Sequence, residues 1–381
     1  MKFLIKFSIP FLFLLLISTL YYGSFVKGQV KILYGEKRKT IQAPPYSLLI
    51  ESTEKFKSQF QDHVNDQIIG KNRLLRYKCQ MEYHVFNQSP FPQVVVKGSN
   101  NWLYYNFENN IDSYQGVPRL SIEKLEEVKR SLIQKKRWLN GKGIDFVLFI
   151  APSKPEIYPE FLPKKLRHNK GQSSWSKQLV EYLEKDTSLW LVYPETEMQI
   201  AKQHKSLYYK HDSHWNFQGA YVGYKALQDF LHSKSSKYQP AFQEKDFNSY
   251  KEERNEFDLL LLINLGNPIT LLIDKPSTPD SIKLIKREGS DYKNYSPNST
   301  HFISSNIEKA PKALIFRDSY AHDLTYYLSC NYSKSVYVWT PLIYSDIIEK
   351  EKPDVVILEI ASRFINDLWI PNDEKINLVD K

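Results

Sequence analysis

Cysteine is scarce in this chain. There are two among 381 residues, Cys79 and Cys330, and they stand far apart without CxxC spacing. A structural zinc site needs four ligands, commonly in closely spaced pairs, so the cysteine count excludes a site of that kind. One disulfide remains open, and two cysteines do not distinguish an oxidising compartment from a reducing one. Zinc-finger spacing, an RNP-type aromatic motif and a basic heptad region are also absent, so no nucleic-acid partner is expected.

Charge of one sign is not concentrated anywhere. The net charge is +9, from 52 Lys and Arg against 43 Asp and Glu, and the lysines are spread along the chain. This balance is compatible with a modest affinity for acidic polysaccharide or anionic lipid, and equally with a simple compositional bias. With 42% hydrophobic and 14% aromatic residues, the chain can bury the core of one large or two ordinary domains.

Long apolar runs are absent except at the start of the chain, where Phe7–Val26 follows Lys2 and Lys6. That run is about long enough to cross a bilayer as a helix. Because no A-x-A-like cleavage site is evident, an uncleaved signal-anchor is favoured over a cleaved signal peptide, and a buried core helix is a further alternative. The lysines are expected to stay in the cytoplasm. The protein is therefore expected in the inner (cytoplasmic) membrane through one N-terminal helix, with its main domain periplasmic or extracellular.

The rest of the chain divides by composition into a linker, one domain and a tail. Phe56, Phe60, Val64 and Ile68 recur at helical spacing, and "VVVKGSNNWLYY" predicts two short strands around a turn at Gly98–Asn101. The predicted organisation is a signal-anchor over 1–28, a linker over 29–47, one domain over 48–372 with a polar insertion at about 234–310, and a tail over 373–381.

From Ser121 onward, helical and strand patterns alternate. Ser121 is suited to cap a helix that carries Leu125 and Val128 on one face, and Gly141 or Gly143 is suited to end it. The following strands, such as "DFVLFIAP", are apolar on both faces, as in a parallel sheet. The later ones are "LWLVYP", "KALIFRDSY", "SVYVWTP" and "PDVVILEIASRF", with a helix at Trp175–Leu183. We therefore predict an α/β fold of three layers, αβα, with a mainly parallel sheet.

Ligands of such sheets collect at the carboxyl ends of the strands. Ser319 lies where "KALIFRDSY" passes from strand to helix, so its hydroxyl can stand exposed beside the N–H groups of a helix start. An ordinary helix N-cap is the alternative.

Asp212 and His214 lie in "HKSLYYKHDSHWNFQGAYVGY". Two residues apart in an extended segment, they point to the same side, so the carboxylate can orient the imidazole as a base for a serine. Two alternatives stay open from spacing alone. Asp212 or Ser213 caps the next helix while His214 packs in the core, or His211, Asp212 and His214 bind a metal.

Several segments together resemble the alginate O-acetyltransferase family. They are "DSHWN" followed by "GAY", then "FRDSY", "APSKPEIYPEFLP", "KGSNNWLYY" and "KPDVVILEIASRF", and the resemblance extends from about Phe56 to Phe364. It implies an SGNH-hydrolase-like fold and the acetylation of exopolysaccharide outside the inner membrane. In that family the carboxylate and histidine precede the serine, which is the order in this chain.

The resemblance implies a role for each of three residues. Ser319 would be the acetylated nucleophile, His214 the general acid/base and Asp212 its orienting partner. It also implies a polysaccharide substrate and a multi-pass membrane acyltransferase partner that delivers the acetyl group. No cofactor and no metal are expected. The chain departs from the family where related segments read Gly-x-Ser, since it has Arg317-Asp318-Ser319.

Four further residues are candidates for binding an oxyanion or the substrate: Arg317, Tyr320, Asn216 and Tyr158. Arg317 is equally suited to a structural ion pair, and Asn216 to capping a helix. Glu359 and Arg363, four residues apart after the last strand, are expected to form a structural ion pair.

The leading hypothesis is thus a membrane-anchored O-acetyltransferase that acts on a cell-surface glycan. An acetyl esterase with the same three residues is one alternative, because the sequence does not disclose whether water or a sugar hydroxyl reaches the acyl-enzyme. A non-catalytic glycan-binding or assembly protein is another. Asp212, His214 and Ser319 are all present, which argues against it.

Overall fold

The computed structural model describes residues 32–33, 38–39, 41–67, 71–107, 109–168, 173–266, 268–295, 298 and 300–369. The signal-anchor predicted over 1–28 and the tail predicted over 373–381 lie outside these residues. Within the part that is described, no helix combines the length and apolar character that a membrane span requires. The chain forms two compact units, Met1–Pro90 with Leu260–Gly266, and Phe91–Leu259 with Asn267–Lys381.

The smaller unit contains the helix expected from the spacing of Phe56, Phe60 and Val64. It is α3 (Thr53–Gln67), and the rings of Phe56 and Phe60 stack with their centroids 5.9 Å apart. The other described elements before Pro90 are β1 (Ile32–Leu33), β2 (Arg38–Lys39), α2 (Ser47–Glu51) and α4 (Lys71–His84).

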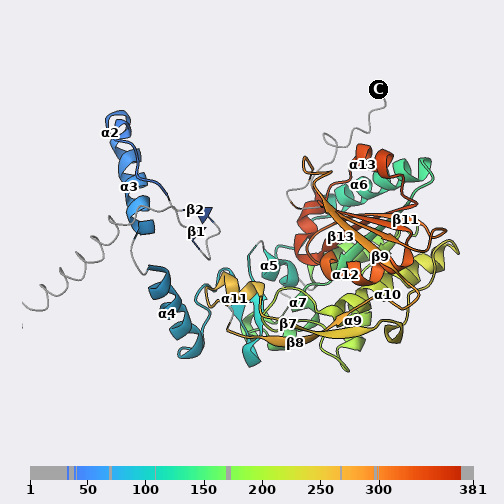
Figure 1. Ribbon diagram of the computed structural model, residues 1–381, viewed down its shortest axis with the longest axis horizontal. Coiled ribbons are helices and arrows are strands. Elements are labelled where there is room, and N and C mark those ends of the chain that lie inside the picture. Colours follow the sequence, from blue (N-terminus) through green and yellow to red (C-terminus); the bar gives the residue numbers. More distant parts are fainter. Residues whose placement is uncertain are drawn as a thin grey trace, which may run out of the picture. The chain divides into compact units, whose positions relative to one another are not determined.

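The larger unit is organised around a seven-stranded sheet of order β6-β5-β13-β11-β12-β10-β9 (Figure 1). Its strands are β5 (Asp145–Ala151), β6 (Leu191–Val192), β9 (Leu284–Gly289), β10 (Thr300–Ser305), β11 (Lys312–Arg317), β12 (Lys334–Trp339) and β13 (Val355–Ala361). β6, β5, β13, β11 and β12 pair in parallel. β10 pairs antiparallel with both β12 and β9.

The prediction of a mainly parallel sheet is therefore wrong, because the sheet is mixed. The two antiparallel strands, β9 and β10, lie inside the segment 234–310 that was predicted to be an insertion. β9 is an edge strand of sequence LIKREG, with its four central residues exposed. An exposed edge strand needs no apolar alternation, so its pairing leaves no signal in the sequence.

Helices cover both faces of the sheet, which confirms the three-layer α/β arrangement. Neighbouring residues of β5 point to opposite faces, so Val147 and Phe149 join one apolar cluster and Phe146 and Leu148 the other. The first cluster includes residues of α10 (Phe217–Lys234) and α12 (Ala321–Leu328). The second includes residues of α6 (Ile122–Gly141), α8 (Trp175–Leu183) and α13 (Ser345–Glu351).

Local signals place several of these elements. The hydroxyl of Ser121 accepts a hydrogen bond from the N–H of Lys124 at 3.2 Å and so caps α6. Gly143 lies past the end of that helix with φ of +74°, a conformation that favours glycine. The predicted strand pair is β3 (Val95–Lys97) and β4 (Leu103–Tyr105), and Asn100 and Asn101 in its turn have positive φ.

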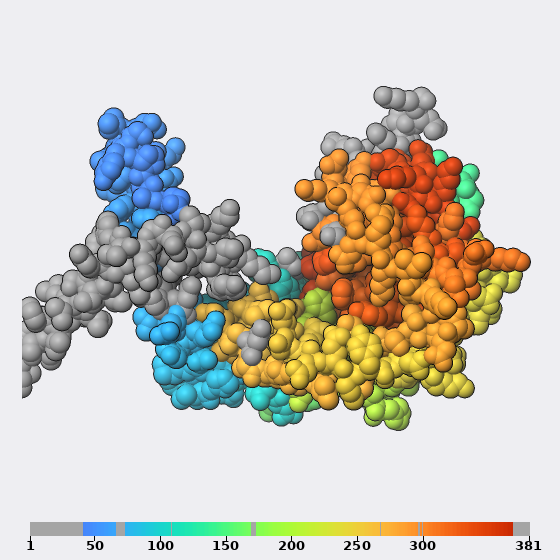
Figure 2. Space-filling view, in the orientation of Figure 1, coloured from blue at the N-terminus to red at the C-terminus, as the bar shows by residue number. Residues whose placement is uncertain are grey.

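A polar segment outside the main sheet reaches the region described below. β7 (Ser249–Arg254) and β8 (Leu271–Pro276) form a separate antiparallel pair, and α11 (Asp258–Leu262) follows β7. In Figure 2 this part of the chain, coloured yellow to orange, contributes to the surface of the larger unit. The remaining helices of the larger unit are α5 (Asn110–Gln115), α7 (Lys154–Ile157) and α9 (Glu195–Ala201).

Candidate active site

The site forms where parallel strands end beside one another. β11 ends at Arg317, and Ser319 occupies the turn before α12 begins at Ala321. β13 pairs in parallel with β11 and ends at Ala361, two residues before Arg363. Since parallel neighbours end at the same edge of a sheet, the turn after β11 and the turn after β13 lie next to each other. Ser319 is partly exposed there.

A closed loop brings Asp212 and His214 to the same place. The loop is pinched by an antiparallel bridge between Tyr208 and Trp215. Inside it, the buried ammonium of Lys154 donates to three backbone carbonyls, those of Leu103, Lys210 and Asp212, at 2.7, 2.8 and 2.9 Å. Burial lowers the pKa of Lys154 to about 7, against the opposing effect of Asp212. The backbone around Asp212 is thus held from the interior of the protein.

Three side chains form a continuous hydrogen-bonded series. His214 Nδ1 lies 2.7 Å from Asp212 Oδ1, and His214 Nε2 lies 2.8 Å from Ser319 Oγ. The backbone N–H of His214 also donates to Asp212 Oδ1, at 3.0 Å. The series is satisfied when Nδ1–H donates to the carboxylate and Nε2 accepts from the serine hydroxyl. In that state the imidazole is placed to take a proton from Ser319.

Two residues that the sequence did not indicate complete the surroundings of Asp212. Arg254, at the end of β7, places its Nη2 2.6 Å from Asp212 Oδ2. The Asp258 carboxylate, at the start of α11, lies 3.6 Å from His214 Nδ1 and accepts from the Ser213 N–H at 2.7 Å. Both come from the predicted insertion, where "KEERNEFD" has no local feature that marks two of its charges for a buried site.

The pKa shifts follow from these contacts. Burial alone raises the pKa of Asp212, but the hydrogen bonds and charge of His214, together with Arg254, outweigh burial and hold that pKa well below its ordinary range. Burial also opposes the protonation of His214, yet Asp212 raises the pKa of His214 above that of a free imidazole. Burial and the charge of Asp212 raise the pKa of Asp258. Asp212 is therefore the ionised partner of the histidine.

Asp318 has a structural part to play beside the nucleophile. Its Oδ1 accepts from the N–H of Tyr320 at 2.8 Å, and its Oδ2 accepts from the N–H of Ala361 at 2.6 Å. The N–H of Asp318 in turn donates to Glu359 Oε2 at 3.0 Å. These bonds tie the turn after β11 to the end of β13, so Asp318 fixes the turn in which Ser319 lies.

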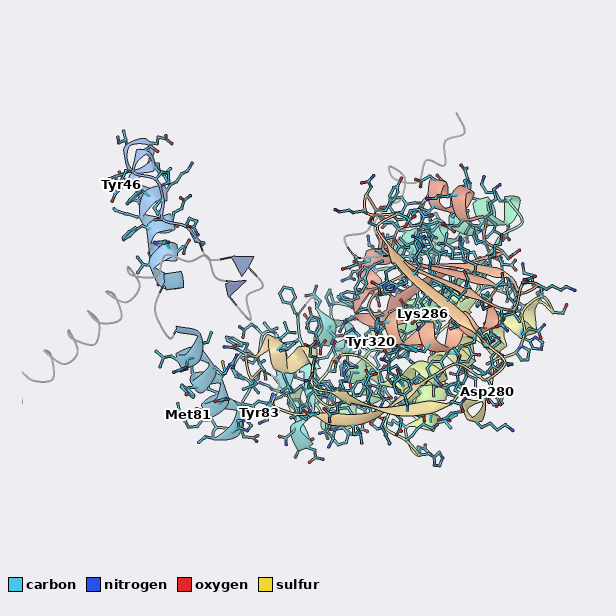
Figure 3. All side chains as sticks on the ribbon, viewed as in Figure 1. Tyr46, Met81, Tyr83, Asp280, Lys286 and Tyr320 are labelled. Carbon is cyan, nitrogen blue, oxygen red and sulfur yellow. The ribbon has the colours of Figure 1, made fainter. Side chains whose placement is uncertain are left out.

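Tyr320 connects the nucleophile's turn to the histidine loop. Its hydroxyl donates to the carbonyl of Ser213 at 2.8 Å, and the indole N–H of Trp215 donates to the carbonyl of Tyr320 at 3.1 Å. Its ring centroid lies 5.2 Å from that of His214. Tyr320 is labelled in Figure 3, where it comes directly before α12.

The other three predicted binding residues have their hydrogen bonds elsewhere. Arg317 is 2% exposed, stacks on the ring of Trp339 at 4.3 Å and donates to the Asp318 carbonyl at 3.1 Å. Asn216 caps α10 by accepting from the Gly219 N–H at 3.0 Å. The hydroxyl of Tyr158 accepts from the Leu207 N–H at 3.0 Å. These contacts support the structural alternatives for Arg317 and Asn216.

The group of possible metal ligands differs from the one that the sequence suggested. Within the described part of the chain, Asp212, His214 and Asp258 offer ligand atoms within 4.8 Å of one another. The ring of His211 instead lies edge-on to Phe257, with the centroids 6.2 Å apart. Both oxygens of Asp212 already have partners, His214 and Arg254. This donor set suits an oriented base better than a metal, because the guanidinium would oppose a second cation.

A serine, an imidazole and a carboxylate in series at a strand end define the acyl-transfer class of α/β proteins. A family model described as "SGNH hydrolase-like domain, acetyltransferase AlgX" matches residues 95–281. That region includes Asp212 and His214 and ends before Ser319. The chain belongs to this SGNH hydrolase-like acetyltransferase family, and it is an O-acyltransferase. Among curated proteins, none matches the chain.

Solved structures share the fold. Bacillus cereus PatB1 with a sulfonyl adduct is 15% identical, with a TM-score of 0.53 over 73% of this chain and 99% of that one. The O-acetyltransferase domain of Pseudomonas putida AlgJ is 20% identical, with a TM-score of 0.46 over 74% of this chain and 94% of that one. At this identity, the likeness to PatB1 shows the α/β fold alone.

Proposed function

We propose that this protein transfers an acetyl group, through an acyl-serine intermediate on Ser319, to hydroxyls of a cell-surface or exported polysaccharide. The observation that carries the proposal is the position of His214, whose two ring nitrogens lie 2.7 Å from Asp212 Oδ1 and 2.8 Å from Ser319 Oγ. A serine becomes a strong nucleophile when an oriented base of this kind removes its proton.

The reaction would proceed in two halves. In the first, Ser319 Oγ attacks the acetyl carbonyl of a donor ester while His214 takes the hydroxyl proton, and the donor alcohol leaves with that proton. In the second, His214 takes the proton of a sugar hydroxyl, which attacks the acetyl-serine. Ser319 then leaves and regains its proton from His214. Asp212 stabilises the imidazolium that forms in each half.

The proposed setting is extracytoplasmic. It depends on the apolar run Phe7–Val26 behind Lys2 and Lys6, which is suited to anchor the protein in the cytoplasmic membrane. A domain outside the cytoplasm has no direct access to cytoplasmic acetyl donors. A multi-pass membrane acyltransferase is therefore the proposed partner that delivers the acetyl group.

The test uses the full-length chain in mild detergent with an activated aryl acetate, with and without candidate oligosaccharides. We expect acetylated sugar and, in the absence of sugar, a protein whose mass increases by one acetyl group on Ser319. Ser319→Ala should abolish both products, because no other hydroxyl lies in hydrogen-bonding distance of His214 Nε2 among the described residues.

Other outcomes separate the alternatives. Acetate release at a rate unaffected by any sugar would indicate an acetyl esterase. No acetyl-protein and no product, together with full complementation of a deletion strain by Ser319→Ala, would rule out the catalytic proposal and favour a glycan-binding or assembly role.

A further inference from the structure

Arg363 comes closest of the arginines to the nucleophile. It lies two residues past the end of β13, at the start of the 3₁₀ segment Ser362–Trp369. Its side chain is buried, with 6% of the residue exposed, and its Nη2 lies 3.5 Å from Ser319 Oγ. The sequence suggested an ion pair between Arg363 and Glu359, but the Glu359 carboxylate instead accepts from the N–H of Asp318.

The guanidinium of Arg363 is surrounded by rings. Its central carbon lies 4.9, 5.3 and 4.7 Å from the ring centroids of Tyr105, Tyr320 and Phe364. Its Nε is buried and has no hydrogen-bond partner in the described part of the protein. In contrast, Arg254 is paired with Asp212 at 2.6 Å. A buried cation held by aromatic faces keeps its charge available to a new anion.

The other donors near Ser319 are already engaged. The N–H of Tyr320 donates to Asp318 Oδ1, and the side-chain amide N–H of Asn216 donates to the Ser206 carbonyl. Nη1 of Arg317 donates to the Asp318 carbonyl. The departure from Gly-x-Ser at Arg317-Asp318-Ser319 therefore coincides with a turn whose hydrogen bonds hold the turn itself together.

We propose that Arg363 is a catalytic residue, which stabilises the oxyanion of the tetrahedral intermediate on Ser319. This rests on the proposed acetyl transfer. When Oγ bonds to the acetyl carbon, the electron pair of the carbonyl double bond moves to its oxygen, and His214 holds the hydroxyl proton. That oxygen and Oγ are then bonded to the same carbon, so the negative charge develops within reach of Nη2. The charge returns to the carbon–oxygen double bond when the donor alcohol leaves with the proton.

Arg363 serves the second half of the reaction in the same way. The sugar oxygen bonds to the acetyl carbon, the same oxyanion forms, and it collapses with Ser319 as the leaving group. A preorganised donor that meets charge only in the transition state lowers the barrier without tightening the binding of the ester. The positive charge of Arg363 also opposes protonation of His214, which keeps the base neutral before the attack.

The test compares Arg363→Met and Arg363→Lys with wild type, as full-length chains, on an aryl acetate. For Arg363→Met we expect kcat to fall by about 10²- to 10³-fold, the effect of losing one oxyanion donor, with KM little changed. Arg363→Lys should recover part of the rate, because it restores a cation without the planar fork. Affinity for an alkyl phosphonate that forms a tetrahedral adduct on Ser319 should fall in parallel with kcat.

Arg167→Met is the matched control, since Nε of Arg167 is also buried without a partner and its Nη2 donates to the Leu162 carbonyl at 3.1 Å. Its kcat should equal that of wild type. If Arg363→Met is folded by thermal melting and acylates Ser319 at the wild-type rate, the oxyanion role is wrong while the proposed function stands. If wild type itself forms no acetyl-serine, both fail. A fall in KM-dependent binding alone, with kcat and phosphonate affinity unchanged, would also overturn the role.

Discussion

At the scale of single residues, charge is divided so that each group of the site has one part to play. Asp212 is 3% exposed at its side chain and keeps its negative charge because His214 and Arg254 each take one of its oxygens. Burial of an unpaired carboxylate would instead favour the neutral acid. An ionised Asp212 is what makes the imidazolium of His214 accessible during proton transfer.

The pH dependence follows from the pKa of His214. Catalysis requires the neutral imidazole, and Asp212 raises the pKa of His214 above its ordinary value. Activity is therefore expected to be full at alkaline pH and to be lost as the pH falls through this raised pKa. In Asp212→Asn the carboxylate no longer favours the imidazolium, so the acidic limb of kcat/KM should move to lower pH while kcat falls by about 10⁴-fold.

The measurement is kcat/KM for the aryl acetate as a function of pH in both proteins. An acidic limb at the same pH in Asp212→Asn would show that His214 is not the group that titrates. A limb that moves to higher pH would contradict the electrostatic role of Asp212.

At the scale of elements, β7 joins the site although it is not part of the main sheet. Its first residues are exposed, whereas its last residue, Arg254, meets Asp212 and stacks over the ring of Tyr209 at 4.3 Å. Asp258 follows at the start of α11. The strand and helix therefore extend the hydrogen-bonded series of Ser319, His214 and Asp212 outward by one charge of each sign.

Arg254→Met tests whether this element matters for the reaction. Without the guanidinium the pKa of Asp212 should rise, because the Arg254 charge contributes to keeping it low. We expect kcat/KM to fall by about tenfold, equivalent to ~1.4 kcal/mol in the transition state. Lys251→Met is the control from the same strand, since Lys251 pairs with Asp274 at the surface, at 2.7 Å. Equal activity of the two variants in the aryl acetate assay would count against a role for Arg254.

The comparison of sequence and structure divides along the same line. Apolar patterning predicted the strands that end at Ser319, and the two-residue spacing of Asp212 and His214 predicted that they face one side. Arg254, by contrast, is one charge within a polar run, and only the pairing of β7 with β8 brings it to Asp212. A contact that depends on long-range pairing of polar strands has no local pattern from which it could be predicted.

The same limit explains the error in the sheet. The parallel strands are apolar on both faces and were recognised for that reason, whereas β9 is an exposed edge of charged residues. Arg363 was noted in the sequence, but its direction toward Ser319 is a property of the turn after β13 rather than of its spacing from Glu359.

At the scale of the whole molecule, the membrane prediction stands apart from the described residues. If Phe7–Val26 anchors the protein, the mature chain keeps Met1 and partitions with membranes after washing at high pH. The check is N-terminal sequencing of the protein from its native host, together with carbonate extraction of the membranes. A mature N-terminus near residue 28 would show that the segment is a cleaved signal peptide.

The paired hydrogen bonds between Tyr320 and the loop of Ser213 and Trp215 have one more consequence. They join two stretches of chain that are 105 residues apart in sequence, at both ends of the gap that a proton crosses. The length of chain between those stretches is therefore free to vary without changing the gap, provided that it leaves Arg254 in reach. Insertions and deletions between residues 277 and 299 are thus the alterations that this architecture tolerates best, and a library of loop lengths there would retain the acyl-transfer geometry while varying the surface offered to the acceptor.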